Sequence, residues 1–216
     1  MALLPRIVVL ISGRGSNMAA LLAACLPLKV AAVISNRPQA PGLELAAAQG
    51  IPTVVVDHES YAAREAFDQA LVREIDRHQP QLVVLAGFMR IFTPAFVAHY
   101  QGRLINIHPS LLPAFPGLHT HRQALAAGVR IHGCTVHFVT DRLDHGPIVA
   151  QAAVPVLVQD TECLLAARVL RQEHQLYPAV LRWWAEGRLK MRADGSVEVQ
   201  GAVLQDSSMQ VPGMVQ

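Results

Sequence analysis

The sequence predicts an α/β protein with a Rossmann-like, mostly parallel sheet in its N-terminal half, antiparallel strands in its C-terminal half and helices on both faces. Two observations support this prediction. Up to about residue 100, short apolar runs of strand length alternate with helical patterns, which is typical of βα units wound on a parallel sheet. Later in the chain, two strand-like runs are separated only by residues 141–146, a spacing that fits a hairpin and is too short for a parallel crossover.

The length of 216 residues and the hydrophobic content of 52% fit one such domain with a sizeable core. We expect this domain to span residues 1–204, and we expect the aperiodic segment 205–216 to form a mobile tail. The formal net charge is only +2 and the basic residues are scattered, so neither a nucleic acid nor a membrane is indicated as a partner. The three cysteines show neither a disulfide framework nor zinc spacing, which favours a cytoplasmic location.

In the N-terminal half, the expected strands are apolar, β-branched runs that end at a turn or a proline. They cover residues 6–12, 30–34, 51–56 and 82–86. The first run is too short for a signal peptide or a membrane span. Helices are expected over 18–24, 41–49, 60–77 and 94–100. Within the third helix, one apolar stripe is formed by Ala63, Phe67, Leu71 and Ile75.

The C-terminal half begins with a strand over 104–107, which His108-Pro109 ends because proline cannot donate to a strand ladder. A turn with a short helix over 117–127 precedes the two hairpin strands, 131–140 and 147–155. Asp160-Thr161-Glu162 is expected to cap a long helix to about residue 184, with an apolar stripe of Leu165, Val169, Leu176 and Val180. Asp194-Gly195 predicts a last hairpin between 189–191 and 197–199.

Asn106 and His108 stand two apart at the end of a predicted strand, so their side chains leave the same face. One is a neutral hydrogen-bond donor, and the other titrates near neutral pH. Such a pair at the carboxyl end of a strand suits acyl-type chemistry. A buried Asn and His satisfied by backbone groups is the alternative, and these two residues alone leave both open.

A glycine-rich turn, Gly13-Arg14-Gly15-Ser16-Asn17, joins the first strand to the first helix. In this position Gly15, Ser16 and Asn17 would aim backbone N–H groups at an anion such as a phosphate. The turn lacks the third glycine of a dinucleotide fingerprint and the Gly-Lys-Ser/Thr of a Walker loop. The alternative is a plain tight turn in which Ser16 or Asn17 caps the helix.

Three further features have two interpretations each. The apolar segment 87–92 contains one Arg and suits the binding of a flat aromatic ligand with an anionic tail. The alternative is a hydrophobic loop that packs under the next helix. Without a known family for comparison, Arg64 is interpreted as a solvated charge on the helix surface. Glu173 faces either a pocket or water. Several histidines lie between His108 and His145, but they lack metal-ligand spacing, and we expect no metal site.

Five segments together resemble the phosphoribosylglycinamide formyltransferase family, which are folate-dependent enzymes of purine synthesis. The segments are Val9–Asn17, Leu85–Ile91, Asn106–Pro113, Pro116–Arg122 and His137–Pro147. The third segment is shared with other enzymes that use 10-formyltetrahydrofolate. The first and fourth segments narrow the resemblance to the enzymes acting on glycinamide ribonucleotide. The resemblance extends to about Met191.

The resemblance implies direct transfer of the formyl group from the co-substrate 10-formyltetrahydrofolate to the amino group of glycinamide ribonucleotide, through a tetrahedral intermediate and without a metal. It implies a catalytic trio of Asn106, His108 and Asp144. The substrate-binding residues that it implies are Gly15, Ser16, Asn17 and Glu173. The co-substrate-binding residues that it implies are Arg64, Met89, Arg90, Ile91, Phe92, Asn106, Thr140 and Asp141. A cis Leu112–Pro113 bond is expected by the same resemblance, and the protein is expected to be a monomer or a homodimer.

Four positions depart from the family's pattern, namely Arg14, Phe92, His145 and Leu170. Three other functions compete with the formyltransferase. Formyltetrahydrofolate deformylase uses water in place of the amine, has an N-terminal regulatory domain and would have no use for a phosphate loop. The formyltransferase acting on initiator methionyl-tRNA has a further RNA-binding domain. We expect neither domain here, and an intact trio argues against a ligand-binding module with an inactive site.

Overall fold

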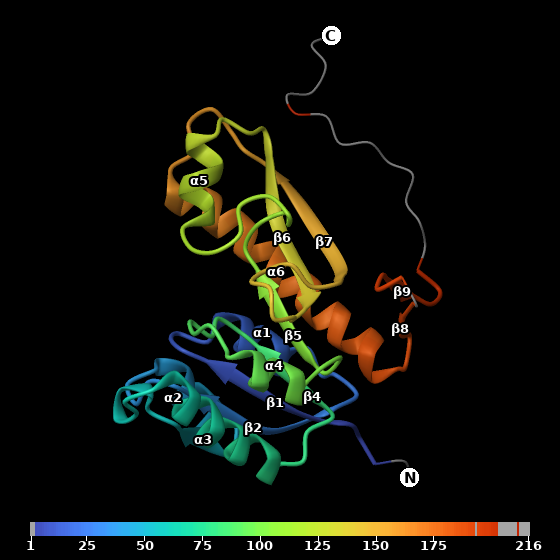
Figure 1. Ribbon diagram of the computed structural model, residues 1–216. Coiled ribbons are helices and arrows are strands. Elements are labelled where there is room, and N and C mark those ends of the chain that lie inside the picture. Colours follow the sequence, from blue (N-terminus) through green and yellow to red (C-terminus); the bar gives the residue numbers. More distant parts are fainter. Residues whose placement is uncertain (1–2, 193, 203–210, 212–216) are drawn as a thin grey trace.

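The computed structural model describes residues 3–192, 194–202 and 211, and its main feature is one seven-stranded sheet (Figure 1). The strands are β1 (Arg6–Ile11), β2 (Lys29–Ser35), β3 (Thr53–Val55), β4 (Leu82–Leu85), β5 (Leu104–His108), β6 (Ile131–Phe138) and β7 (Ile148–Pro155). They lie in the order β3-β2-β1-β4-β5-β6-β7. The first five are parallel, whereas β6 is antiparallel to β5 and β7 to β6. The predicted fold class is therefore confirmed.

Helices cover both faces of this sheet. They are α1 (Ser16–Ala23), α2 (Pro41–Ala47), α3 (Arg64–Arg77), α4 (Pro94–His99), α5 (Thr120–Ala126) and α6 (Glu162–Ala185). A separate antiparallel pair, β8 (Leu189–Met191) and β9 (Val197–Val199), confirms the last predicted hairpin. The Leu112–Pro113 peptide bond is cis, as the resemblance implied.

Strand β1 shows why both faces need a cover. Its side chains Ile7, Val9 and Ile11 pack in one core cluster with α1 and α6. The alternate side chains, Val8 and Leu10, pack in a second cluster with α3 and α4. All five are fully buried, as expected for a continuous apolar strand inside a parallel sheet. A third cluster joins α5 and α6 to the hairpin strands β6 and β7.

The start of α3 corrects the sequence-based prediction. The predicted start at Ser60 is wrong, because the helix begins at Arg64 and exposed Ala63 is only its N-cap. Asp57 accepts a hydrogen bond from the Glu59 N–H and so caps a separate 3₁₀ turn, η1 (His58–Ser60). The chain then passes through an extended residue before the helix forms. The remainder of the predicted stripe, Phe67, Leu71 and Ile75, is buried.

Tyr177 of α6 ties the last residue of β4 to the start of β5. Its hydroxyl lies 3.0 Å from the carbonyl oxygen of Leu85 and 3.2 Å from that of Ile105, so one donor serves β4 and β5. The side chain is fully buried. Because Ile105 directly precedes Asn106, this contact fixes the backbone at the point where the candidate site begins.

We expect Tyr177→Phe to lower the free energy of unfolding by about 1–3 kcal/mol, because two buried carbonyl oxygens lose their donor while the ring packing is kept. Urea unfolding at neutral pH measures the change. Tyr61→Phe, at a half-buried position, is the matched control and should have little effect. Equal stability of the Tyr177→Phe variant and the unaltered protein would contradict the assigned role of the hydroxyl.

Some predictions concern residues outside this description. The predicted tail, residues 205–216, lies outside the described residues except for Val211. The single domain over residues 1–204 stays a prediction. Among the residues that the structure describes, no helix combines the length and the apolar character that a membrane span requires.

Candidate active site

The carboxyl ends of the parallel strands β1, β4 and β5 bring several of the predicted site residues to one side of the sheet (Figure 1). Strand β1 leads into the turn 13–17, β4 leads into the segment 87–92, and β5 ends at His108. Ligands of open α/β sheets bind at this edge, because the loops that leave the strands there can surround them.

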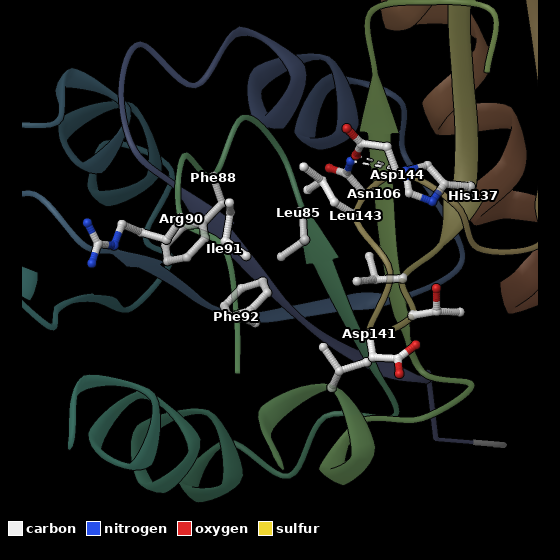
Figure 2. A pocket seen from close by; sticks show the side chains of 13 residues that line it. Leu85, Phe88, Arg90, Ile91, Phe92, Asn106, His137, Asp141, Leu143 and Asp144 are labelled. Atoms are coloured by element: carbon white, nitrogen blue, oxygen red, sulfur yellow. Dashed lines mark hydrogen bonds and ion pairs between the residues drawn. The ribbon is translucent and has the colours of Figure 1, made fainter. Parts of the chain in front are cut away.

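A cavity opens between the segment after β4, the end of β5 and the loop after β6 (Figure 2). It is lined by Leu85, Phe88, Arg90, Ile91, Phe92, Val97, Asn106, His137, Val139, Thr140, Asp141, Leu143 and Asp144. Figure 2 shows that the polar side chains of Asn106, His137 and Asp144 lie together at one end, away from Phe88 and Phe92. We call this space the central cavity. It offers apolar walls, a polar end at Asn106, and the further polar side chains of Arg90, Thr140 and Asp141.

Asn106 is held by His137, which stands opposite it in the antiparallel pairing of β5 and β6. The Nδ1 atom of His137 lies 2.9 Å from the carbonyl oxygen of Phe138, which can only accept, so Nδ1 carries the proton. Burial lowers the pKa of His137, which keeps the ring neutral. Its Nε2 therefore accepts from the Asn106 amide at 3.2 Å. The same amide nitrogen has a second proton for a ligand in the cavity.

His108 and Asp144 form the second polar pair. The Nδ1 atom of His108 lies 3.6 Å from Oδ2 of Asp144, and both side chains are buried. The other ring nitrogen, Nε2, donates to the carbonyl oxygen of Phe115 at 3.1 Å. Asp144 Oδ2 also accepts from the backbone N–H of Gly117 at 2.8 Å. These contacts orient an imidazole and a carboxylate toward each other beside the amide of Asn106.

Asp144 has an uncommon backbone conformation. Its φ angle is +51°, in the left-handed region that non-glycine residues seldom adopt. The conformation is stabilised by the hydrogen bond to Gly117, which ties the loop after β6 to the loop after β5. Such strain is found where a side chain must be aimed at a site.

The glycine-rich turn is shaped for a close approach of its backbone. Gly15 has a φ angle of +72° and precedes α1, where no side chain caps the first N–H groups. A Cβ atom at Gly15 would lie 3.0 Å from the Cα of Gly42, so the position requires glycine on two counts. The Gly42 N–H in turn donates to the carbonyl oxygen of Gly13 at 3.1 Å. Backbone donors at a helix start form an anion site, in agreement with the phosphate interpretation.

Glu173 of α6 faces this turn and not water, which settles the alternative that the sequence left open. The carboxylate accepts from Nδ2 of Asn17 at 2.6 Å, and the side chain is buried. Burial raises the pKa of Glu173, and the hydrogen bond from Asn17 opposes this rise.

We expect Glu173→Gln to stabilise the free protein at pH 8. Since the folded state holds the Glu173 proton more tightly than the unfolded chain does, the carboxyl costs stability as the pH rises from its ordinary pKa through the raised one. The glutamine variant avoids this cost, and its Tm at pH 8 should be higher than that of the unaltered protein. Thermal unfolding at pH 8 and pH 4 checks this. A gain that persists undiminished at pH 4 would contradict the explanation.

The other predicted residues divide between the central cavity and the surface. Five of them line the cavity, namely Arg90, Ile91, Phe92, Thr140 and Asp141. Arg64 and Met89 are exposed and are not among its lining residues, although the backbone of Met89 belongs to the same segment. The guanidinium of Arg90 lies over the ring of Phe67, 5.9 Å from its centroid. The ligand roles of these residues stay predictions.

Among the departing positions, only Phe92 has a structural explanation. Its ring stacks on Phe96 with centroids 4.0 Å apart and on Phe88 with centroids 5.4 Å apart. This stack extends from the wall of the central cavity into the core. Arg14 and His145 are exposed and Leu170 is half-buried, and the structure gives no reason for these three residues.

The sequence analysis missed three partners of the trio. The sequence marks His137 only as one of several clustered histidines, although its place opposite Asn106 follows once β5 and β6 are paired antiparallel. The Phe115 carbonyl and the Gly117 N–H are backbone groups, and residue type carries no signal for them. No group of three or more His, Cys, Asp or Glu side chains that could hold a metal ion occurs in the described part of the chain.

Comparison with known families shows to which protein family the chain belongs. The Formyl transferase family model matches residues 5–181, which is most of the chain. The chain belongs to the formyl transferase family. "Phosphoribosylglycinamide formyltransferase" of Escherichia coli K12 is 56% identical over 194 residues, which cover 88% of this chain and 92% of the relative.

Solved structures of formyl transferases agree with this assignment. Glycinamide ribonucleotide transformylase 1 from Symbiobacterium toebii superposes with a TM-score of 0.87 at 48% identity, covering 91% of this chain and 94% of that chain. A formyltetrahydrofolate deformylase from Pseudomonas syringae pv. tomato has a TM-score of 0.85 at 31% identity, and the match covers 92% of this chain but 66% of the deformylase. The resemblance to phosphoribosylglycinamide formyltransferases is thus confirmed, and the protein is an enzyme of this family.

Proposed function

We propose that this formyl transferase moves the formyl group of 10-formyltetrahydrofolate to the amino group of glycinamide ribonucleotide. One observation carries the proposal: Asn106 and Asp144 line the polar end of the central cavity, and the imidazole of His108 lies 3.6 Å from the Asp144 carboxylate. An amide donor, an imidazole and a carboxylate are the groups that acyl transfer to an amine requires. The names of relatives at 56% and 48% identity give the same reaction class.

The central cavity is assigned to the folate. Its apolar wall of Phe88, Ile91 and Phe92 suits a flat heteroaromatic ring, and Thr140 and Asp141 offer polar groups to the ring edge. We assign Arg90, Met89 and Arg64 to the outer part of the folate. There a guanidinium can pair with the glutamate carboxylates.

The glycine-rich turn is assigned to the phosphate of the ribonucleotide. The backbone N–H groups of Gly15, Ser16 and Asn17 would donate to it at the start of α1. Glu173, which Asn17 already holds, would accept from a hydroxyl group of the same substrate. The two ligands then meet beside Asn106 and His108.

The reaction begins when the amine attacks the formyl carbon, so that a C–N bond forms and the carbonyl π electrons move to oxygen. The second N–H of Asn106 donates to this oxyanion, and so does Nδ1–H of the His108 imidazolium, whose Nε2–H stays bonded to the Phe115 carbonyl oxygen. Asp144 takes the proton of the attacking amine, directly or through a water molecule, and returns it to N10 of the folate as the old C–N bond breaks. We propose that no metal takes part, because these three side chains supply the hydrogen bonds and the proton transfer.

We expect purified protein to consume 10-formyltetrahydrofolate only when glycinamide ribonucleotide is also present. The amount of tetrahydrofolate released, measured by its absorbance, should equal the amount of formylated ribonucleotide formed. Equal turnover without the ribonucleotide would identify a deformylase instead. Tight binding of both ligands without turnover would identify a ligand-binding module.

We place the reaction in the cytoplasm, where the free thiols Cys25, Cys134 and Cys163 stay reduced.

A further inference from the structure

Ser12 and Asn36 form a buried polar pair that the proposed mechanism does not use. Both lie at the carboxyl edge of the sheet, directly after β1 and β2, and their side chains are only 4% and 1% exposed. Ser12 immediately precedes the glycine-rich turn. Buried polar side chains are kept where their hydrogen bonds fix a geometry, so the partners of this pair indicate its role.

The hydroxyl of Ser12 has one proton and makes two contacts with a definite direction. It donates to Oδ1 of Asn36 at 2.6 Å and accepts from the backbone N–H of Met89 at 2.8 Å. Since Asn36 takes the only hydroxyl proton, a lone pair of the oxygen is left for Met89. Asn36 itself is held through its backbone carbonyl oxygen, which accepts from Nδ1 of His58 at 2.8 Å.

Met89 lies in the segment that forms one wall of the central cavity. Its own side chain is 61% exposed, so it does not anchor the segment by packing. The far end is anchored by Phe92, which stacks on Phe96. The near end is anchored at Ser12, through the Met89 N–H and through the Ser12 N–H, which donates to the Gly87 carbonyl oxygen at 3.1 Å.

We propose that Ser12 and Asn36 are positioning residues for the formyl donor: Asn36 orients the Ser12 hydroxyl, and this hydroxyl holds the 89–92 wall where the folate binds. This inference rests on the proposed function, because it takes the central cavity to be the folate site. It assigns no contact between either residue and the folate. The loss of the hydroxyl should therefore weaken folate binding and leave the chemical step intact.

Ser12→Ala tests the proposal, with Ser35→Ala as the matched control. Ser35 is a fully buried serine at the end of the neighbouring strand, and within the described residues its hydroxyl forms hydrogen bonds only with the backbone of Arg37 in its own loop. We expect Ser12→Ala to raise KM for 10-formyltetrahydrofolate about five- to tenfold, the factor that corresponds to one net hydrogen bond. The KM for the ribonucleotide and kcat should change less than about twofold, and Ser35→Ala should leave all three near their original values.

Asn36 provides the second arm. Asn36→Leu has no acceptor for the Ser12 hydroxyl and should raise the folate KM in the same way. Asn36→Asp keeps a side-chain oxygen that accepts from Ser12, so its folate KM should stay near the original value. A folate KM that is unchanged in Ser12→Ala would overturn the inference. So would a uniform rise of both KM values that Ser35→Ala reproduces, since that result indicates only a loss of stability.

Equilibrium binding of tetrahydrofolate, measured by calorimetry, separates this inference from the proposed function. If the unaltered protein binds the folate but transfers no formyl group, the proposed function fails. The same titration on Ser12→Ala then decides the positioning role, with weaker binding in its favour and equal binding against it. If the unaltered protein binds no folate, both proposals fail.

Discussion

Replacing His108 with alanine is expected to lower kcat of formyl transfer at least a hundredfold, with both substrates still bound. His108 is one of two donors that face the oxyanion in the proposed mechanism, and its ring is fixed between Phe115 and Asp144. Removal of one oxyanion donor typically costs about 3 kcal/mol in the activation barrier, or roughly a hundred- to thousandfold in rate. Single-turnover kinetics at saturating ligands measures the chemical step directly.

His99→Ala is the control for this experiment. His99 is an exposed histidine of α4, paired with Asp76 on the surface. It should leave kcat unchanged. A His108→Ala enzyme with kcat within about threefold of the original would rule out a role in the chemical step. Circular dichroism of both variants excludes unfolding as the cause.

Replacing Asp144 with asparagine is expected to lower kcat by about a hundred- to ten-thousandfold, the range that general acid–base groups contribute. The substitution keeps the shape of the side chain and an oxygen that can accept from the Gly117 N–H, so the loop geometry is retained. It removes the basic group that lies 3.6 Å from His108 and therefore the proposed path of the proton.

The split between kcat and KM distinguishes this role of Asp144 from a structural one. If Asp144 carries the proton, Asp144→Asn should lower kcat and leave both KM values within about twofold, because the lost interaction is made only in the transition state. Asp194→Asn, at an exposed hairpin turn, should keep kcat and both KM values. A variant with raised KM values and an unaltered kcat would show that Asp144 serves only to hold the loop.

The fold could be predicted because its strands are locally unambiguous. The apolar run at Ile7–Ile11 is buried on both sides, and such a run has few alternatives to a central parallel strand. The start of α3 could not be predicted, because the competing turn is capped by a single side-chain hydrogen bond, from the Glu59 N–H to the carboxylate of Asp57. Periodicity counts apolar positions and does not detect such a contact.

The side chains of the candidate site could be predicted from the sequence, but the backbone groups that orient them could not. Asn106 and His108 are marked by their spacing at a strand end, and the resemblance adds Asp144. The groups that aim them are backbone atoms of Phe115 and Gly117, and their positions follow from loop conformation and not from residue type. Long-range pairs such as Ser12 with Asn36 likewise become visible only when the strands are placed side by side.

The fate of an isotopically labelled formyl carbon tests the central claim most directly. The unaltered enzyme is incubated with 10-formyltetrahydrofolate labelled at that carbon, together with glycinamide ribonucleotide. Direct transfer predicts that the label is recovered in the formylated ribonucleotide, in an amount equal to the folate released and with none diverted to formate. Label found chiefly in formate, at a rate independent of the ribonucleotide, would contradict the account.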